Sequence, residues 1–533
     1  MSVSTPGRAR PRSTLPAGQE THPAGYVGRV LDALRRDPDR AVVSWRGRPV
    51  TGAAMAADVA ATVAGLRAQG VRPGVTVALL TSANHPALLI GRYAAHLLGA
   101  AVVHIRSMNP RSDEDLLPAR TQADLLAATG ASVLLADPAH LHRAVELGGE
   151  PAGSGPLVLL RLPTGGAEPL SPDCAVIGCT SGTTGAHKLV AQPFRMWEST
   201  VERLAAAVDV SEPVALLAVT PLSHSVGPMV DAVLGLGGTA ILHETFDPAA
   251  VLRDVVSERI TDVYLTVPHL YRLIEHPDVG RLSASVLRRI VYSGTPAAPH
   301  RIVRAVQVFG GARLTQVYGS TEAGGIASLV PIDHGEPELL GTVGRPFPWA
   351  TVRVVDPSTG LDQPPGTHGE VWVRSDTVMT GYVGRPQHTE AVLSPEGWLR
   401  TGDIGRWDRH GYLTLAGRLD RLINIGGLWV CPSTVEDTLL AHPDVTNAAV
   451  YSIRDFDRVE YLHAAVELRP GASRRLPPLR DHVADLLSPL HAPHAYTLWD
   501  RLPVDETGRP DRARLRTRPV TGFVLPTAPG RTR

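Results

Sequence analysis

The sequence predicts an α/β protein. It has a large N-terminal domain of mostly parallel sheets packed with helices plus a small β-barrel section, and a small mobile α+β domain at the C-terminus. Three observations support this prediction. The chain has 533 residues, more than the roughly 250–300 residues that one hydrophobic core serves. Short apolar runs alternate with longer stretches of helical spacing up to residue 345. The pattern changes there and again after Gly417.

The alternation before residue 345 predicts βα units, because a parallel strand needs a crossover, usually a helix, to reach its neighbour. Strands are expected at residues 75–80, 132–136, 175–179 and 263–266. The most apolar stretch, Pro86 to Ile105, is interrupted by Arg92, His96 and Gly99. It is therefore predicted to be a buried amphipathic helix that runs into a strand, and not a membrane span.

The rest of the chain has a different pattern. Short β-rich runs at 350–356, 369–375 and 411–417 are separated by Gly, Pro and Asp, which indicates a barrel-like or antiparallel section. After Gly417 we expect a helix at 433–442, strands at 447–452 and 461–468, and a helix at 479–488. The predicted division is a disordered arm at 1–22, a large domain at 23–417, a hinge at 418–420, a small lid domain at 421–516 and a disordered tail at 517–533.

The composition excludes several classes of protein. Apolar residues make up 43% of the chain and charged residues 20%, which is typical of a globular protein. The 52 basic and 52 acidic side chains balance, so nothing indicates a nucleic-acid partner. Three cysteines cannot form a disulfide framework. The N-terminus has no apolar stretch for a secretory signal, so a cytoplasmic protein without membrane insertion is expected.

Lys188 is the only lysine of the chain, and every other basic side chain is arginine. It ends the segment Thr180-Ser181-Gly182-Thr183-Thr184-Gly185-Ala186-His187-Lys188, which follows an expected strand. Two glycines permit tight turns, hydroxyl and amide groups can surround an anion, and the compact ammonium adds a mobile positive charge. The segment therefore predicts a phosphate-binding loop, although its glycines are too close together for a P-loop NTPase motif.

A second glycine-rich segment runs from Gly235 to Ala240. A dinucleotide-binding fingerprint follows a strand and opens a helix, whereas this segment precedes an expected strand. It is therefore predicted to be a turn.

The phosphate loop resembles that of the adenylate-forming superfamily, which includes acyl- and aryl-CoA synthetases, adenylation domains of peptide synthetases and luciferases. Further segments are similar to motifs of that family and occur in the same order. They are Gly70–Leu89, Pro221–Gly227, Tyr292–Pro296, Tyr318–Glu322, Gly369–Val373, Gly381–Tyr382, Thr401–Asp403 and Gly417–Asp420. The resemblance covers about residues 25 to 515 and is nearest to acyl- or aryl-CoA ligases.

The resemblance implies a site for ATP and Mg²⁺. The residues that would hold the β- and γ-phosphates are Thr180, Ser181, Gly182, Thr183, Thr184, Gly185 and Lys188. Gly294 and Thr295 would lie beside adenine, and Tyr318, followed by Gly319, would stack on it. Thr321 would bind the α-phosphate and Glu322 would hold Mg²⁺, which prefers hard oxygen ligands. Asp403 would bind both ribose hydroxyls, and Arg418 the ribose or a phosphate.

The resemblance also implies sites for an acid and a thiol. His224 would lie at the acid pocket, and Asp420 would be the hinge about which the small domain swings. Gly426, Gly427 and Trp429 would belong to the face that meets the thiol. Their segment is similar to that of benzoate-type CoA ligases, which favours an aromatic acid. Residues 221–227 contain no aspartate to bind an ammonium, so an α-amino acid is not expected.

One position departs from the family pattern. The lysine of the last family motif, which bridges the acid carboxylate and the α-phosphate, is replaced by Arg509. The guanidinium keeps the charge but not the compact geometry of an ammonium. The position is therefore predicted to be catalytic, with the efficiency of adenylation left open. No carrier domain is expected after residue 515, so the acceptor would be CoA or a separate carrier protein.

The predicted function is that of an ATP-dependent ligase. It would activate a carboxylic acid, aromatic or of medium size and without an amino group, as acyl-AMP and transfer the acyl group to the thiol of CoA or a carrier. One alternative is an adenylating enzyme of secondary metabolism with a different acid or acceptor: an amide synthetase, or a nitrite-activating enzyme that diazotises an aryl amine. The other alternative is an ATP-binding pseudoenzyme.

Overall fold

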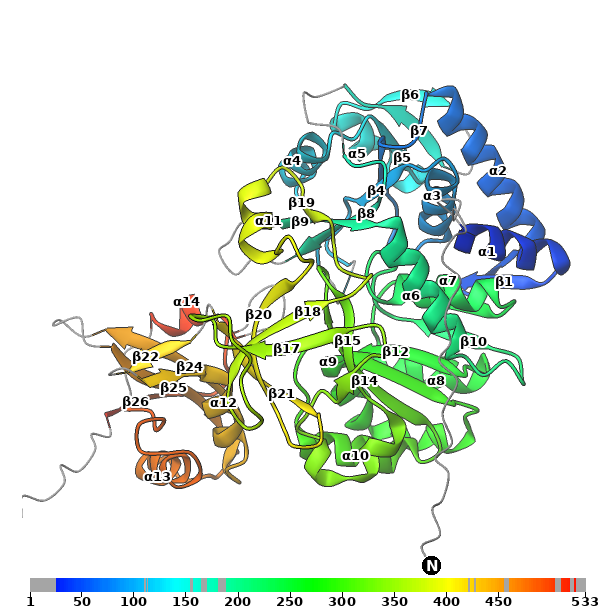
Figure 1. The fold of residues 1–533 in the computed structure, drawn as a ribbon. Helices are drawn as coiled ribbons and strands as arrows, with labels where there is room; N and C mark the ends of the chain where they lie inside the picture. Colours follow the sequence, from blue (N-terminus) through cyan, green and yellow to red (C-terminus); the bar gives the residue numbers. More distant parts are fainter. Residues whose placement is uncertain are drawn as a thin grey trace, which may run out of the picture.

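The computed structural model describes residues 25–109, 112, 114–153, 157–163, 170–180, 188–419, 422–425, 428–454, 460–503, 510–517 and 522–523. These residues form two large sheets with helices between and outside them, a four-stranded sheet, a short hairpin and a small C-terminal sheet (Figure 1). The expected α/β architecture, with a small α+β unit after the large domain, is therefore confirmed.

An eight-stranded sheet contains the strands on both sides of the predicted phosphate loop. Its order is β19-β9-β8-β4-β3-β5-β7-β6. Its strands are β3 (Thr76–Leu80), β4 (Ala101–His104), β5 (Val133–Ala136), β6 (Glu150–Gly153), β7 (Val158–Arg161), β8 (Cys174–Thr180), β9 (Lys188–Pro193) and β19 (Gly381–Tyr382). The central strands β8, β4, β3 and β5 are parallel. The strands predicted at 75–80, 132–136 and 175–179 match β3, β5 and β8.

A nine-stranded sheet has the order β16-β15-β14-β13-β12-β10-β11-β1-β2. Its strands are β1 (Ala41–Trp45), β2 (Arg48–Thr51), β10 (Ala215–Ala218), β11 (Thr239–Leu242), β12 (Asp262–Thr266), β13 (Arg289–Ser293), β14 (Arg313–Ser320), β15 (Gly324–Leu329) and β16 (Arg345–Pro346). Within this order, the neighbouring strands from β14 through β13, β12, β10 and β11 to β1 are all parallel. The strand predicted at 263–266 lies in β12, and residues 236–238 form the predicted turn before β11.

The apolar stretch from Pro86 to Ile105 folds as predicted, into α3 (Pro86–Leu97) and then β4. The ring of His85 caps the helix by accepting a hydrogen bond from the Ala87 amide at 3.0 Å. Pro86 occupies the first turn, where its missing N–H is not needed. Gly99 then takes a positive φ of 67°, which lets the chain turn into the strand.

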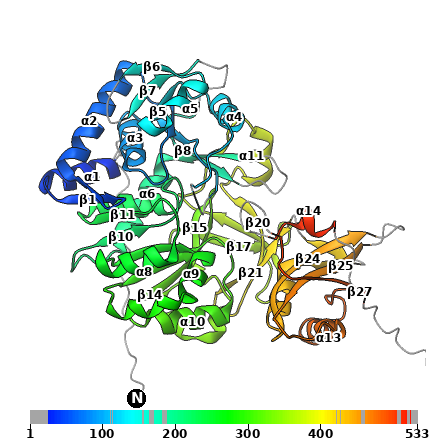
Figure 2. The same cartoon turned by 180° about the vertical axis from the view of Figure 1, so that it is seen from behind.

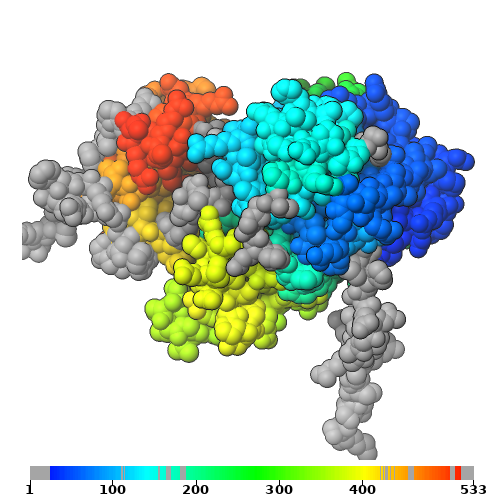
Figure 3. Space-filling view, turned by 90° about the horizontal axis from the view of Figure 1, so that it is seen from above, coloured from blue at the N-terminus to red at the C-terminus, as the bar shows by residue number. Residues whose placement is uncertain are grey.

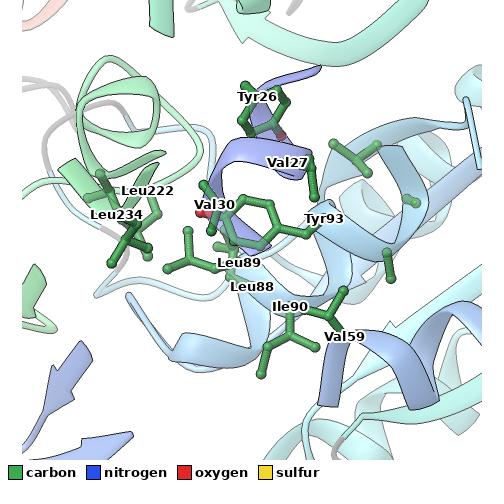
Figure 4. Packing of buried hydrophobic residues seen from close by; sticks show 14 of the residues in the cluster. Tyr26, Val27, Val30, Val59, Leu88, Leu89, Ile90, Tyr93, Leu222 and Leu234 are labelled. Atoms are coloured by element: carbon green, nitrogen blue, oxygen red, sulfur yellow. The ribbon is translucent and has the colours of Figure 1, made fainter. Parts of the chain in front are cut away.

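Helices from both sides fill the space between the two large sheets. They are α1 (Gly25–Arg36), α2 (Gly52–Ala68), α3, α6 (Phe194–Ala206) and α7 (Val226–Gly235). Their apolar side chains form one buried cluster, in which Tyr93 of α3 lies against Val30 of α1 (Figure 4). Inside this cluster, Arg92 of α3 and Asp231 of α7 form an ion pair of 2.6 Å. This pair connects the helices of the two sheets.

Other helices cover the outer faces. The helices α8 (Pro248–Ser257), α9 (Val267–Ile274) and α10 (Pro299–Phe309) pack on the nine-stranded sheet. The helices α4 (Ala119–Thr129) and α5 (Leu141–Glu146) pack on the eight-stranded sheet. Among the helices in the described ranges, none is long and apolar enough to cross a membrane.

The section after residue 345 is an antiparallel sheet with the order β17-β18-β20-β21. Its strands are β17 (Thr351–Val355), β18 (Gly369–Arg374), β20 (Leu399–Trp407) and β21 (Leu413–Arg418), and α11 (Pro386–Val392) precedes β20. Of the two forms expected for this section, barrel-like or antiparallel, the described strands show the antiparallel pairing. The apolar side chains of this sheet pack against those of β14 and β15.

The C-terminal unit lies beside the large domain, on the side away from the N-terminal helices (Figures 2 and 3). Its elements are β22 (Ile423–Ile425), β23 (Leu428–Val430), α12 (Pro432–Leu440), β24 (Val445–Arg454), β25 (Glu460–Leu468), α13 (Pro477–Leu486), β26 (Ala495–Trp499), α14 (Arg512–Leu515) and β27 (Gly522–Phe523). The two helices and two strands predicted between 433 and 488 match α12, β24, β25 and α13.

Two residues of the tail contribute a short strand to the C-terminal sheet. Residues 517–533 were expected to be disordered, but Gly522 and Phe523 pair antiparallel with Tyr496 and Ala495 of β26. An edge strand presents unpaired backbone N–H and C=O groups, and the tail satisfies some of those of β26. The arm at 1–22 and residues 524–533 lie outside the described residues.

Candidate functional site

The predicted ATP residues come from three different sheets. Thr180 ends β8 and Lys188 begins β9, and the two residues are cross-strand partners. The phosphate loop is therefore the connection of an antiparallel pair. Ser181, Gly182, Thr183, Thr184 and Gly185 lie in that connection, outside the described residues.

Tyr318, Asp403 and Arg418 form one hydrogen-bonded cluster. The Tyr318 hydroxyl, on β14, donates to Oδ2 of Asp403 on β20 at 2.6 Å. The other carboxylate oxygen, Oδ1, accepts from Nη1 of Arg418 at 3.1 Å. Asp403 and Arg418 are cross-strand partners in β20 and β21. Burial, followed by the nearby Asp403 carboxylate, raises the pKa of Tyr318 well above its usual value. The phenol is therefore neutral and acts as a donor.

The backbone conformation and close contacts of Gly402, the residue before Asp403, favour a glycine at this position. Its φ is +71°, a conformation that side chains rarely adopt. A Cβ at this position would lie 2.9 Å from Nη2 of Arg418. Glycine therefore allows the guanidinium to lie across the strand beside the Asp403 carboxylate.

A second cluster joins Lys188 and Glu322 through Tyr382. The Lys188 Nζ lies 5.0 Å from the centroid of the Tyr382 ring, a distance typical of a cation–π contact. The Tyr382 hydroxyl donates to Oε1 of Glu322 at 3.0 Å. Burial and the Glu322 carboxylate raise the pKa of Tyr382. Lys188, which is predicted to bind phosphate, and Glu322, which is predicted to bind a cation, therefore both contact the same tyrosine.

Thr321 joins the two large sheets. Its carbonyl oxygen accepts a hydrogen bond from Nε2 of Gln192 on β9 at 2.9 Å. A Cβ on Gly178 of β8 would lie 2.7 Å from Cγ2 of Thr321, so only glycine leaves room for this contact. Gly178 and Gln192 thus bring the strands beside the phosphate loop against the segment that carries Thr321 and Glu322.

Gly319 and Gly294 also occupy positions with little freedom. A Cβ on Gly319 would lie 2.0 Å from the carbonyl oxygen of Gly324, at an irregularity in the pairing of β14 and β15. Gly294 follows β13 with a φ of +98°, and Thr295 comes next in the same loop. Ser293 is the residue before Gly294, and its Oγ lies 2.6 Å from the Tyr264 hydroxyl. These residues lie at the carboxyl ends of parallel strands, where ligands of open α/β sheets bind.

His224 lies in the turn before α7, and its Nδ1 is 2.9 Å from the Ser223 hydroxyl. Burial lowers the pKa of His224 to about 4. The ring is therefore neutral at pH 7 and can donate or accept one hydrogen bond at each nitrogen, according to its tautomer.

Two side chains hold this turn in place. The Asn84 amide nitrogen donates to the carbonyl oxygen of Thr220 at 2.9 Å, and its oxygen accepts from the Leu222 amide at 2.9 Å. Arg92 donates from Nη1 to the Leu222 carbonyl oxygen at 3.1 Å. Asn84 has a φ of 46°, a conformation that Asn tolerates better than most residues. Both side chains lie more than a hundred positions away in the sequence.

Sequence reasoning did not assign roles to Asn84, Arg92, Gln192 or Tyr382. Arg92 was noted only as an interruption of an apolar stretch, and Tyr382 only as part of a motif. An arginine inside an otherwise buried helix was the available signal, because a buried charge needs a partner. Asn84 and Gln192 carry no comparable signal, because their contacts are made only in the folded chain.

Several predicted residues cannot be placed. Arg509, Asp420, Gly426 and Gly427 lie outside the described residues. The backbone of Trp429 lies in β23, paired with Asn424, but its side chain is not described. Their roles stay predictions.

The described residues contain no group of three metal-ligating side chains. Glu322 therefore offers one carboxylate, close to the end of the phosphate loop. This donor set suits a Mg²⁺ ion that takes most of its ligands from nucleotide phosphates and water, and does not suit a cation held by protein alone.

Comparisons with known proteins agree with this geometry. The profile of the AMP-binding enzyme family matches residues 31–383, and that of the AMP-binding enzyme C-terminal domain matches residues 434–509. Feruloyl-CoA synthase of Amycolatopsis sp is 33% identical over 502 residues, which cover 91% of this chain and 97% of that protein.

Two solved structures are similar over nearly their whole length. The amide bond synthetase McbA of Marinactinospora thermotolerans has a TM-score of 0.79 and 35% identity, covering 93% of this chain and 99% of that one. The o-succinylbenzoate CoA synthetase MenE of Bacillus subtilis, in complex with AMP, has a TM-score of 0.74 and 26% identity, with coverages of 92% and 98%. The chain belongs to the AMP-binding enzyme family and is an adenylate-forming ligase.

Proposed function

We propose that this member of the AMP-binding enzyme family activates an aromatic or medium-size carboxylic acid as acyl-AMP and transfers the acyl group to a thiol of CoA or a carrier protein. The observation that carries the proposal is the convergence of two clusters on residues 318–322. One cluster is Lys188–Tyr382–Glu322, and the other is Tyr318–Asp403–Arg418. Together they offer a cation for phosphate, a carboxylate for a metal ion and a carboxylate for ribose hydroxyls.

In the first step, a carboxylate oxygen of the acid attacks the α-phosphorus of ATP and the bond to pyrophosphate breaks. Negative charge builds up on the phosphoryl oxygens, so preorganised cations and N–H groups lower the barrier. We assign the β- and γ-phosphates to Lys188 and the loop before it, and the α-phosphate to Thr321. A Mg²⁺ ion on Glu322 would neutralise phosphate charge. The Asp403 carboxylate would accept hydrogen bonds from the ribose hydroxyls.

In the second step, the thiol sulfur attacks the acyl carbonyl and gives up its proton to solvent, the thioester forms and AMP leaves with the electrons of the broken C–O bond. We propose that Arg509 reaches the carboxylate and the α-phosphate in the first step. The small domain then turns about residues 418–420 and presents Gly426, Gly427 and Trp429 to the thiol. A short connector with glycine on one side can absorb such a rotation.

Of the two kinds of acid, an aromatic one is favoured for two reasons. The segment 426–436 is similar to that of benzoate-type CoA ligases, and similar proteins include a feruloyl-CoA synthase, 4-coumarate–CoA ligase-like proteins and an o-succinylbenzoate CoA synthetase. An α-amino acid would lack a carboxylate for its ammonium at 221–227.

An amide synthetase is the second candidate. The sequence identity to McbA is 35% over 93% of this chain, which is higher than the 26% identity to MenE. The first step would be the same, but an amine nitrogen would attack the acyl carbonyl, lose a proton and release AMP. The two candidates differ only in the acceptor.

The test is the release of pyrophosphate and AMP from Mg-ATP with a panel of benzoates, cinnamates, fatty acids and nitrite. Each acid is supplied with CoA, with an aryl amine, or alone. Acid-dependent pyrophosphate release with an acyl-CoA product supports the main proposal, and an amide product supports the second. Turnover with nitrite and amine only, or ATP binding without any turnover, overturns both.

A matched pair of variants links the activity to this site. Lys188→Gln removes the ammonium beside the phosphates, and pyrophosphate release should fall by about 10²–10³-fold, as when one transition-state donor is lost. Arg161→Gln is the control, because Arg161 is an exposed cation of β7 that binds Gln69. Equal activity of the two variants would contradict the assignment of Lys188.

A further inference from the structure

Lys188 and Glu322 carry opposite charges beside the same side chain, yet they do not pair with each other. The ring of Tyr382 lies under the Lys188 ammonium, at 5.0 Å from its centroid, and the Tyr382 hydroxyl holds Glu322 at 3.0 Å. Within the described part of the chain, neither Lys188 nor Glu322 forms an ion pair. One tyrosine therefore gives each charge a partner, the ring for Lys188 and the hydroxyl for Glu322.

Two ions of opposite sign attract each other strongly in a partly buried site, where the effective dielectric constant is well below that of water. If Lys188 and Glu322 met, the ammonium would be unavailable to phosphate and the carboxylate unavailable to a cation. A nucleotide would then have to break an ion pair before it could bind. A contact with an aromatic ring and a neutral phenol is easier to exchange for a full charge.

The backbone around Tyr382 fixes its position. Tyr382 pairs with Val190 of β9, two residues from Lys188. Its amide donates to the Thr389 hydroxyl of α11 at 2.9 Å. Gly381 packs against the same threonine, since a Cβ there would lie 2.8 Å from Cγ2 of Thr389. The strand and α11 thus fix the backbone from which the ring projects, and the Tyr382 side chain is itself buried, at 8% exposure.

We infer that Tyr382 is a positioning residue that keeps Lys188 and Glu322 apart before the nucleotide binds, so that each remains available to the opposite charge on Mg-ATP. The inference rests on the proposed function, which assigns Lys188 to phosphate and Glu322 to Mg²⁺. Its hydroxyl occupies Oε1 of Glu322 and leaves Oε2 for the cation. Tyr382 itself bonds to neither ATP nor acid in this role.

The experiment is calorimetric titration of the full chain with ATP, with and without Mg²⁺. Tyr382→Ala removes the spacer, so the affinity for ATP without Mg²⁺ should fall by about tenfold or more. Tyr382→Phe keeps the ring under Lys188 and loses only the hydroxyl. It should bind ATP without Mg²⁺ like the native protein, but should need a several-fold higher Mg²⁺ concentration to reach its full affinity.

A double variant separates this role from a merely structural one. In Tyr382→Ala combined with Glu322→Gln, the competing ion pair cannot form, so the affinity for ATP without Mg²⁺ should return to within about twofold of that of Glu322→Gln alone. Tyr412→Phe is the control, because the Tyr412 hydroxyl donates to the Asp333 carboxylate at 2.9 Å away from this site. Circular dichroism and thermal unfolding report whether each variant is folded.

Each outcome is decisive. Failure of the native protein to bind ATP overturns the proposed function, whatever the variants do. Native binding with an unchanged Tyr382→Ala variant, or with a loss that Glu322→Gln does not restore, overturns the role of Tyr382 and leaves the proposed function intact.

Discussion

Two arginine–aspartate pairs in this chain differ in their surroundings. Arg92 and Asp231 lie between the two large sheets at 2.6 Å, and both side chains are 0% exposed. Arg418 and Asp403 lie on the small antiparallel sheet at 3.1 Å, with exposures of 41% and 18%. The Asp231 carboxylate also accepts from Tyr93 at 2.6 Å and from Trp197 at 2.9 Å.

The difference shows which pair serves the fold and which can serve a ligand. A buried carboxylate needs several donors to offset its desolvation, and Asp231, at 0% exposure, is out of reach of a substrate. The open pair keeps solvent access, so ribose hydroxyls can replace water without breaking the fold. The predictions below test or sharpen this comparison, from the largest expected effect to the smallest.

Breaking the buried pair should have the largest effect. Asp231→Ala leaves the Arg92 guanidinium buried without its counter-ion, which typically costs about 3–5 kcal/mol. The free energy of unfolding, measured by denaturant titration, should fall by this amount. The matched variant Asp403→Ala should lower it by less, about 1–3 kcal/mol, because it leaves the buried Tyr318 hydroxyl without its acceptor but leaves the Arg418 guanidinium open to solvent. Similar losses in both variants would contradict the comparison.

Removing the open carboxylate should affect nucleotide binding instead. A hydrogen bond to a charged group contributes about 1.5–3 kcal/mol, so Asp403→Ala should raise the KM for ATP by about 10–100-fold. The KM for the acid should stay within about twofold. Steady-state kinetics on the best acid of the panel measures both values. An Asp403→Ala enzyme with a native KM for ATP would refute the assignment of Asp403 to ribose.

Protonation of buried histidines should destabilise the fold in acid. Burial lowers the folded-state pKa of His224 and of His463 to about 4 and that of His96 to about 3. The unfolded chain binds these protons near pH 6.5, so it holds more protons than the folded chain below that pH. The free energy of unfolding should therefore fall as the pH drops from about 6.5 to 4, and change little through these groups above 6.5.

His224→Gln isolates one of these groups. Its stability curve between pH 6 and 4 should be shallower than the native curve by at most one proton, or about 1.4 kcal/mol per pH unit. Denaturant titrations at several pH values give the slope. A variant with the native slope would mean that His224 is protonated as readily in the folded chain as in the unfolded one.

Loosening the turn that carries His224 should have the smallest effect. Asn84→Gly suits the positive φ of 46° and removes the hydrogen bonds to Thr220, Leu222 and His243. The KM for the acid should rise several-fold, with the KM for ATP unchanged. Ser211→Gly, in an exposed loop, is the control. A rise in both KM values would mean that Asn84 supports the whole domain and not this turn.

The sequence alone determined the fold class, the family, the order of the motifs along the chain and the identities of most candidate residues. Hydrophobic patterning is a local property, so the strands at 75–80, 132–136 and 263–266 could be predicted from their own residues. Phosphate-binding chemistry is local as well, because glycines, hydroxyls and one lysine stand in nine consecutive positions. The family motifs then assigned Tyr318, Glu322 and Asp403 to a common ligand.

Only the tertiary structure decided which of these residues touch. Lys188 and Tyr382 are brought together by the pairing of β9 with β19. Asn84, which follows β3 of the eight-stranded sheet, bonds to Thr220, which follows β10 of the nine-stranded sheet. The pairing of Gly522 with Tyr496 also depends on an edge strand that no local pattern reveals. Periodicity reports which face of an element is buried, but not what lies against it. That depends on packing between segments far apart in the chain, which fixes every side-chain contact in the site.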